Sequence, residues 1–380
     1  MNMQIKLTAL TILLSALSFT GMTQSNPLQY LITGTYTGGK SEGIYVFEFN
    51  SNNGSYREVS HIKSSNPSFL AVSPDEKFVY AVNENGNNDN GGEVSAFSFD
   101  KKTGRLAAIN KQLSGGDAPC YIQTDKTGRW VVAGNYSSGT LSVLPVSASG
   151  ELGNATTTIQ HKGSGVNKER QEKPHVHCTI FSQDDKWLFV PDLGIDKVMI
   201  YAFDSKTGKL KPAPQPYVKI KDGGGPRHLT FHPNNQYAYL MEEMGGAVDV
   251  FQYSNGKLKP IQHIASVQTN DTGFIGSADI HVSADGKFLY ASNRGGFNTI
   301  AIYKIDQQNG TLTFIGHQSS LGEIPRNFTI DPSGNYLLAA NQESDNIVIF
   351  KRNAATGLLT DTGTRIEVGK PVCLKWIGKE

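Results

Sequence analysis

Apolar and polar residues alternate in short segments along most of the chain, and turn-forming residues separate these segments. Alternation of this kind predicts β-strands, and pairs such as Thr-Gly and Asn-Gly predict tight hairpin turns. The segments recur as a unit of roughly 46 to 55 residues, and each unit contains four of them. A repeat of this length built from β-strands is typical of a β-propeller.

Six copies of the first strand pair are continuous in the sequence, at residues 67–84, 119–136, 176–193, 226–243, 277–294 and 325–342. The copy at 176–193 carries two extra residues, Pro174 and His175, in front. A seventh copy is split, because residues 371–378 supply its first strand and residues 29–36 supply its second. We therefore predict an all-β fold, a seven-bladed β-propeller with four antiparallel strands per blade and one blade closed by both chain termini.

The first residues have the outline of a secretory signal peptide. Residues 1–6 carry one Lys, residues 7–19 are apolar, and small residues follow at Gly21, Thr23 and Ser25. The apolar run is too short for a confident membrane span. We expect residues 1–24 to be removed, and residues 25–380 to form one propeller domain. This domain would be exported, to a bacterial periplasm, with no stable membrane insertion after cleavage.

Charge and cysteine content exclude several classes of protein. The formal net charge is +1, so no basic field for binding nucleic acid is expected. The three cysteines, Cys120, Cys178 and Cys373, are too few and too scattered for a disulfide framework or a zinc site. We expect them to be inert thiols in the core.

The repeat also predicts where a site can lie. In an antiparallel blade the start of the first strand and the end of the second strand lie at the same end, and the first strands line the propeller axis. The opposite end carries ordinary turn formers in every copy, whereas this end varies between copies. Its first-strand starts and second-strand ends carry His175, His177, Arg227, His228, Asp279, Arg326, Asn327, Glu84, Asp192, Glu242, Glu243, Arg294 and Gln342. Varied chemistry on a constant scaffold predicts a functional site at this mouth of the central channel.

One column of this end is more uniform. It reads Asn83, Asn135, Asp192, Glu242, Asn293 and Asn341. An Asn or Asp side chain can satisfy backbone groups where a strand ends, so a structural role is predicted for the Asn members. Glu242 departs from the pattern, and its role stays open.

The residue types at the mouth favour hydrolysis of a small anionic ester. A His–Glu pair suits general acid–base work on water, and Arg side chains suit carboxylate or phosphate groups and a developing oxyanion. Structural roles remain open: hydrogen-bonded histidines or a partial metal site at His175 and His177, and ion pairs for Arg227, Arg294 and Glu243. His281 is expected to be a hydrogen-bonded histidine of the core.

Several motifs carry a family resemblance. They are PHVH (174–177), GGGPRHLTFHPN (223–234), YLMEE (239–243), ADIHVSADGKFLYASNRG (278–295) and PRNFTIDPSGNYLLAANQ (325–342). Together they resemble the seven-bladed lactonase family, which contains propeller-type bacterial 6-phosphogluconolactonases and a fungal carboxy-muconate cyclase. The resemblance extends over residues 29–376, and it includes a loop at 163–174 that brings Arg170 and Gln171 toward the same mouth.

The resemblance implies a site in this sequence. The family's proposed His falls on His175 or His177, and its two Arg and its Glu fall on Arg227, Arg294 and Glu243. The candidate substrate-binding residues are Arg170, His228, Glu242 and Arg326. The family usually has Asn where this chain has Glu242, and a second carboxylate beside Glu243 is expected to raise a carboxylate pKa.

The implied activity is opening of a small anionic lactone, such as 6-phosphogluconolactone or a related aldonolactone, with no metal and no organic cofactor. Export argues for a different lactone, since 6-phosphogluconolactone is a cytosolic metabolite. Two alternatives stay open. One is a propeller that only binds a ligand or scaffolds a partner, and the other is a muconate-type cyclase that closes lactones.

Overall fold

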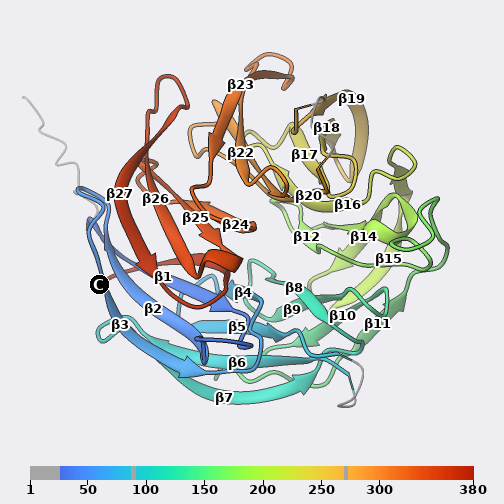
Figure 1. The fold of residues 1–380 in the computed structure, drawn as a ribbon. Helices are drawn as coiled ribbons and strands as arrows, with labels where there is room; N and C mark the ends of the chain where they lie inside the picture. Colours follow the sequence, from blue (N-terminus) through green and yellow to red (C-terminus); the bar gives the residue numbers. More distant parts are fainter. Residues whose placement is uncertain (1–25, 87–90, 269–272) are drawn as a thin grey trace, which may run out of the picture.

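The computed structural model describes residues 26–86, 91–268 and 273–380. Within them the chain forms seven four-stranded antiparallel sheets, here called blades, which follow one another around a central axis (Figure 1). The predicted seven-bladed propeller is confirmed. The expected signal peptide at residues 1–24 lies outside the described residues.

From axis to rim, six blades each consist of four strands that are consecutive in the chain. They are β4 (Phe69–Val72), β5 (Phe78–Asn83), β6 (Glu93–Asp100) and β7 (Arg105–Leu113); β8 (Pro119–Thr124), β9 (Trp130–Asn135), β10 (Thr140–Pro145) and β11 (Thr157–Gln160); β12 (Ile180–Phe181), β13 (Trp187–Asp192), β14 (Lys197–Asp204) and β15 (Lys209–Lys219); β16 (Pro226–Phe231), β17 (Tyr237–Glu242), β18 (Ala247–Ser254) and β19 (Lys257–Ala265); β20 (Ile275–Val282), β21 (Phe288–Gly295), β22 (Thr299–Ile305) and β23 (Leu312–Ser319); β24 (Pro325–Ile330), β25 (Tyr336–Asn341), β26 (Asn346–Arg352) and β27 (Leu359–Glu367).

The seventh blade contains both ends of the described chain. Its order is β28 (Pro371–Gly378), β1 (Leu28–Thr35), β2 (Gly43–Asn50) and β3 (Tyr56–Lys63). β28 pairs with β1 antiparallel, with Leu31 opposite Trp376, and in Figure 1 the C-terminus lies beside the blue N-terminal strands. This pairing confirms the split repeat and closes the ring without an unpaired inner edge.

Buried tyrosines fasten neighbouring blades to one another. The hydroxyl groups of Tyr80 on β5, Tyr239 on β17 and Tyr290 on β21 donate to the carbonyl oxygens of Gly150, Gly310 and Gly357 at 3.3, 3.0 and 2.8 Å. Each of these glycines lies in the turn between the third and fourth strands of the next blade. The same contact at these three junctions joins each blade to the next one along the chain.

The Asn column has the structural role that the sequence predicts. The side-chain amides of Asn83, Asn135, Asn293 and Asn341 donate to the carbonyl oxygens of Ser65, Ser114, Ser266 and Ser320. Each carbonyl lies just beyond the fourth strand of the preceding blade. In each of these four blades one amide thus satisfies a backbone acceptor that would otherwise be buried without a partner.

The three cysteines are buried and free, as expected. Among the described residues there is no helix long and apolar enough to span a membrane. The helical segments of this described part of the chain are two short 3-10 helices, Leu193–Ile195 and Gln342–Ser344.

Candidate active site

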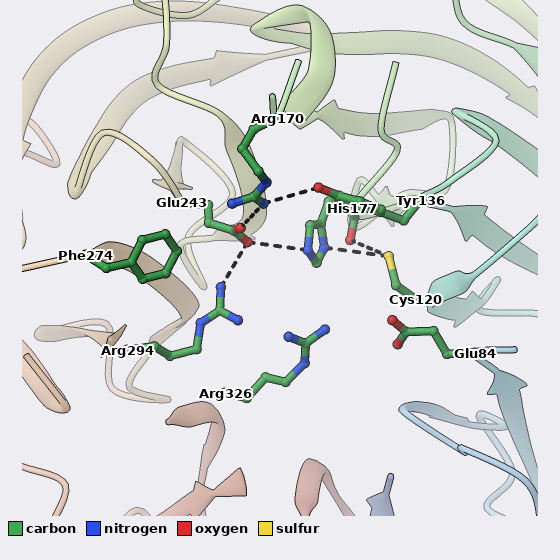
Figure 2. A pocket seen from close by; sticks show the side chains of 9 residues that line it. All are labelled: Glu84, Cys120, Tyr136, Arg170, His177, Glu243, Phe274, Arg294 and Arg326. Atoms are coloured by element: carbon green, nitrogen blue, oxygen red, sulfur yellow. Dashed lines mark hydrogen bonds and ion pairs between the residues drawn. The ribbon is translucent and has the colours of Figure 1, made fainter. Parts of the chain in front are cut away.

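A cavity of about 280 Å³ opens where the starts of first strands meet the ends of second strands. Figure 2 shows side chains from separate blades directed into it. Its lining consists of Glu84, Cys120, Tyr136, Arg170, His177, Glu243, Phe274, Arg294 and Arg326. The predicted mouth therefore exists, and ring closure brings together residues that are far apart in the sequence.

Glu243, directly after β17, is the centre of this cluster. Its Oε1 accepts from Arg170 Nη2 at 2.6 Å. Its Oε2 lies 2.9 Å from Arg227 Nε and 3.0 Å from Arg294 Nη2. The His177 Nε2 atom is 3.6 Å from the same oxygen, which is longer than a hydrogen bond. One carboxylate thus holds three guanidinium groups from different parts of the chain.

These neighbours keep Glu243 ionised. Burial by itself raises the pKa of Glu243, but Arg294, Arg227, His177 and Arg170 together hold this pKa well below its usual value. The ionised carboxylate carries no proton to donate at neutral pH, and both of its oxygens already accept from guanidinium groups. The charge of Glu243 is therefore available for orienting cations.

His177 is the titratable group of the lining that suits proton transfer. Its side chain is 6% exposed, and burial together with Arg227 holds its pKa well below 6.5. The imidazole is therefore neutral at neutral pH and can accept a proton. Its Nδ1 lies 3.7 Å from the Cys120 Sγ atom on β8.

Cys120 was expected in the core, but it lines the cavity. Burial, helped by Glu84, raises the pKa of this thiol well above its usual value. A thiol in that state is a poor nucleophile, so its position beside His177 does not create a Cys–His nucleophilic pair.

Arg227 and His228, at the start of β16, lie beneath the cavity. Arg227 Nη1 is 2.8 Å from the Ala278 carbonyl oxygen and 3.2 Å from His228 Nε2. His228 Nδ1 is 2.8 Å from Asp279 Oδ1, and burial lowers the pKa of His228 to about 4. Both side chains support the cluster from behind, and neither belongs to the cavity lining.

The second oxygen of Asp279 contacts His281 Nε2 at 2.9 Å. The His281 side chain is hydrogen-bonded as expected, but it is 36% exposed and not part of the core.

His175 lies outside the cavity lining. Its ring stacks on Tyr136 at 4.4 Å between centroids, its Nδ1 is 3.0 Å from the Tyr136 carbonyl oxygen, and its Nε2 is 3.2 Å from Glu172. Within the described residues, the group of side chains that could hold a metal ion includes neither His175 nor His177. The placement favours His177 as the histidine that faces a substrate.

Glu242 also lies outside the lining, because neighbouring residues of a strand point to opposite faces. Burial, with Asp249 second, raises the pKa of Glu242 to about 9. A raised carboxylate pKa was expected beside Glu243, and it belongs to Glu242 itself, whereas the pKa of Glu243 is lowered. The expected contact of Glu242 with substrate does not fit this position.

Arg326, at the start of β24, presents an unused guanidinium to the cavity. Its Cζ lies 5.4 Å from the centroid of the Tyr36 ring, and Tyr36 donates to Glu84 Oε2 at 2.8 Å. Among the described residues no hydrogen bond or ion pair occupies the Arg326 donors. With Arg170 and Arg294 it gives the lining three cations against the two carboxylates Glu84 and Glu243. This imbalance suits an anionic ligand.

Tyr136 and Phe274 are the lining residues that the sequence analysis did not single out. Tyr136 follows Asn135 as Glu243 follows Glu242, so the column of second-strand ends already contained it. Its hydroxyl accepts from Arg170 Nη2 at 3.2 Å. Phe274 precedes β20 in a connection that has no repeat pattern, so no signal in the sequence marks it. Gln342, in the same column as Glu243, does not line the cavity.

Comparisons with known proteins agree with this architecture. A family model described as "Lactonase, 7-bladed beta-propeller" matches residues 30–376. A 6-phosphogluconolactonase of Formosa agariphila is 40% identical over 335 residues, which cover 87% of this chain and 94% of the relative.

Two solved structures are similar over nearly their whole length. A putative 6-phosphogluconolactonase of Bacteroides fragilis has a TM-score of 0.88 and 43% identity, covering 93% of this chain and 98% of the other. The periplasmic gluconolactonase PpgL of Pseudomonas aeruginosa has a TM-score of 0.89 and 36% identity, covering 93% and 100%. The chain belongs to the seven-bladed β-propeller lactonase family.

Proposed function

We propose that this protein hydrolyses a small anionic lactone of the 6-phosphogluconolactone or aldonolactone type. The reaction class, opening of a lactone by a carboxylic-ester hydrolase, follows from the family. The single observation that carries the mechanism is a neutral His177 beside an ionised Glu243 that holds three arginines. This arrangement offers a proton acceptor next to fixed positive charge in one cavity.

In the proposed mechanism His177 takes a proton from water as the water oxygen attacks the lactone carbonyl carbon. Glu243 stabilises the imidazolium that results, and guanidinium groups of Arg170 and Arg294 lie beside the developing oxyanion. The bond between the carbonyl carbon and the ring oxygen then breaks, and His177 returns the proton to that oxygen. The product is a hydroxy acid, which releases one proton to solvent at neutral pH.

The name of the Pseudomonas aeruginosa relative supports an extension of the proposal to location. That protein is a periplasmic gluconolactonase, and the first residues of this chain have the composition of a signal peptide. We propose export to the periplasm. The substrate there is a sugar lactone that carries an anionic group, or a neutral sugar lactone that becomes a carboxylate when its ring is opened.

An assay of the purified protein tests the proposed function. Gluconolactone with and without a 6-phosphate group is supplied, and release of acid is followed against the spontaneous rate. A rate well above the spontaneous one with either lactone is expected. No acceleration with either would favour a ligand-binding propeller, and consumption of a muconate-type diacid instead would favour a cyclase.

Arg326→Gln should weaken binding of a phosphorylated lactone. Because a hydrogen bond to a charged group contributes about 1.5–3 kcal/mol, KM should rise about 10- to 100-fold with a smaller change in kcat. The measurement is steady-state kinetics with both lactones. Arg365→Gln is the matched control and should leave KM unchanged, because Arg365 is a half-buried arginine on β27 that pairs with Asp361 and does not line the cavity. An equal loss with both lactones would show that Arg326 does not contact the phosphate.

A further inference from the structure

A second cluster of titratable side chains lies on the blade that supplies Glu243. It consists of Glu242 at the end of β17, Asp249 on β18 and His263 on β19. Asp249 is opposite His263 on one neighbouring strand and opposite Leu240 on the other. Glu242 follows Leu240 by two residues, so its side chain lies on the same face of the sheet as those of Asp249 and His263. Their ligand atoms all lie within 4.8 Å of one another.

The cluster runs from the interior to the surface. The Glu242, Asp249 and His263 side chains are 0%, 13% and 44% exposed. His263 Nδ1 lies 2.8 Å from Asp249 Oδ1 and 3.7 Å from Glu242 Oε1. A small solute can therefore reach the group from solvent at the His263 end.

Glu242 has no donor for either of its oxygens among the described residues, and Asp249 Oδ2 also has none. At the same position four other blades place an Asn whose amide donates to a backbone carbonyl. Without a cation, burial and the neighbouring Asp249 leave Glu242 protonated at neutral pH. A cation that displaces this proton would compensate the charge of the buried carboxylate.

The backbone leaves room for that carboxylate. Gly224 and Gly245 flank it, and a side chain on either glycine would collide with the Glu242 carboxylate group. The Gly224 carbonyl accepts from the backbone amides of Met244 and Gly245 at 3.0 and 2.9 Å. The two glycines therefore form a cradle around Glu242 directly beside Glu243.

We propose that Glu242, Asp249 and His263 bind one divalent cation of the zinc class through two carboxylates and the imidazole Nδ1. Zinc accepts His nitrogen and carboxylate oxygen ligands, whereas an imidazole disfavours Mg²⁺ and Ca²⁺. The two measured separations from Nδ1 bracket the edge of a tetrahedron with bonds of ~2.0 Å, which is about 3.3 Å. The cation neutralises the buried carboxylate and fastens the end of β17, the strand that positions Glu243.

The test uses the full mature protein, free of any affinity tag and treated with chelator. Zn²⁺, Co²⁺, Mg²⁺ and Ca²⁺ are titrated separately by calorimetry, with thermal unfolding and the visible absorption of Co²⁺ as further readouts. One equivalent of Zn²⁺ and of Co²⁺ should bind, and Zn²⁺ should raise Tm because a ligand of the folded state stabilises it.

Glu242→Asn, which copies the residue of the other blades, and His263→Ala should abolish this binding. His61→Ala is the matched control, since His61 is an exposed histidine 3.3 Å from Glu58 and 4.0 Å from Glu42 without a buried carboxylate. It should bind zinc as the wild type does. Tm without metal checks that each variant is folded.

Three results would overturn the proposal. The first is wild-type affinity for zinc in Glu242→Asn, which would mean adventitious binding at surface imidazoles. The second is a response to Ca²⁺ with none to Zn²⁺. The third is no binding of any cation together with a Tm that rises only on acidification, which would mean that Glu242 and Asp249 share a proton. None of these outcomes depends on the lactonase assay, so the two proposals can fail separately.

Discussion

His177→Asn should lower kcat for lactone hydrolysis by about 10²- to 10⁴-fold, the usual contribution of a positioned general base. Asn keeps a polar side chain at this position but has no group that accepts a proton at neutral pH. The measurement is steady-state acid release with the best lactone substrate. His175→Asn is the matched control, because His175 belongs to the same motif but stacks on Tyr136 and does not line the cavity. It should retain most of the activity, and the reverse pattern would assign the base to His175.

The pH profile gives a second readout of the same residue. Burial, with Arg227 second, holds the pKa of His177 well below 6.5. A base works in its neutral form, which is present above its pKa and lost as the pH falls through that value. The acid limb of kcat/KM should therefore lie below pH 6.5. A limb at or above that value would contradict a buried, neutral His177 as the base.

Glu243→Gln should abolish turnover and also destabilise the fold. The substitution leaves the guanidinium groups of Arg170, Arg227 and Arg294 without their shared anion, and removal of one partner of a buried charge pair costs about 3–5 kcal/mol. Activity and thermal unfolding are measured together. The three ion pairs are the reason to expect a loss of stability as well as a loss of activity.

Glu243→Asp separates the two effects. It keeps the negative charge, but the shorter side chain moves that charge away by one methylene. Tm should therefore recover. The kcat should stay low, because a charge in a preorganised site stabilises the transition state only from the correct position. A Glu243→Gln protein that is folded and fully active would remove Glu243 from the mechanism.

The fold could be predicted in detail because its repeat has a physical cause. Each unit must bury the same faces against its neighbours, so the same alternation and the same turns recur. Even the split blade was visible, since residues 371–378 and 29–36 each lack the other half of the pattern. The cluster of Arg227, Glu243 and Arg294 followed from the same alignment, because equivalent strand ends meet at one mouth.

Side-chain direction was harder to predict. The alignment could not separate His175 from His177, since the two extra residues before that repeat shift its start, and the stacking on Tyr136 that removes His175 from the cavity is a tertiary contact. Arg227 had the right neighbours, but its burial under the cavity leaves it few donors for a substrate. Phe274 lies in a connection between blades, where no periodicity constrains the chain.

The pairing of β1 with β28 also has a consequence for how the polypeptide acquires its shape. Its earliest β-strand has no inner partner until the final segment has been made, so the most distant contact in the sequence must form late. Until residues 371–378 pair with β1, the inner edge of that blade stays open and the ring cannot close.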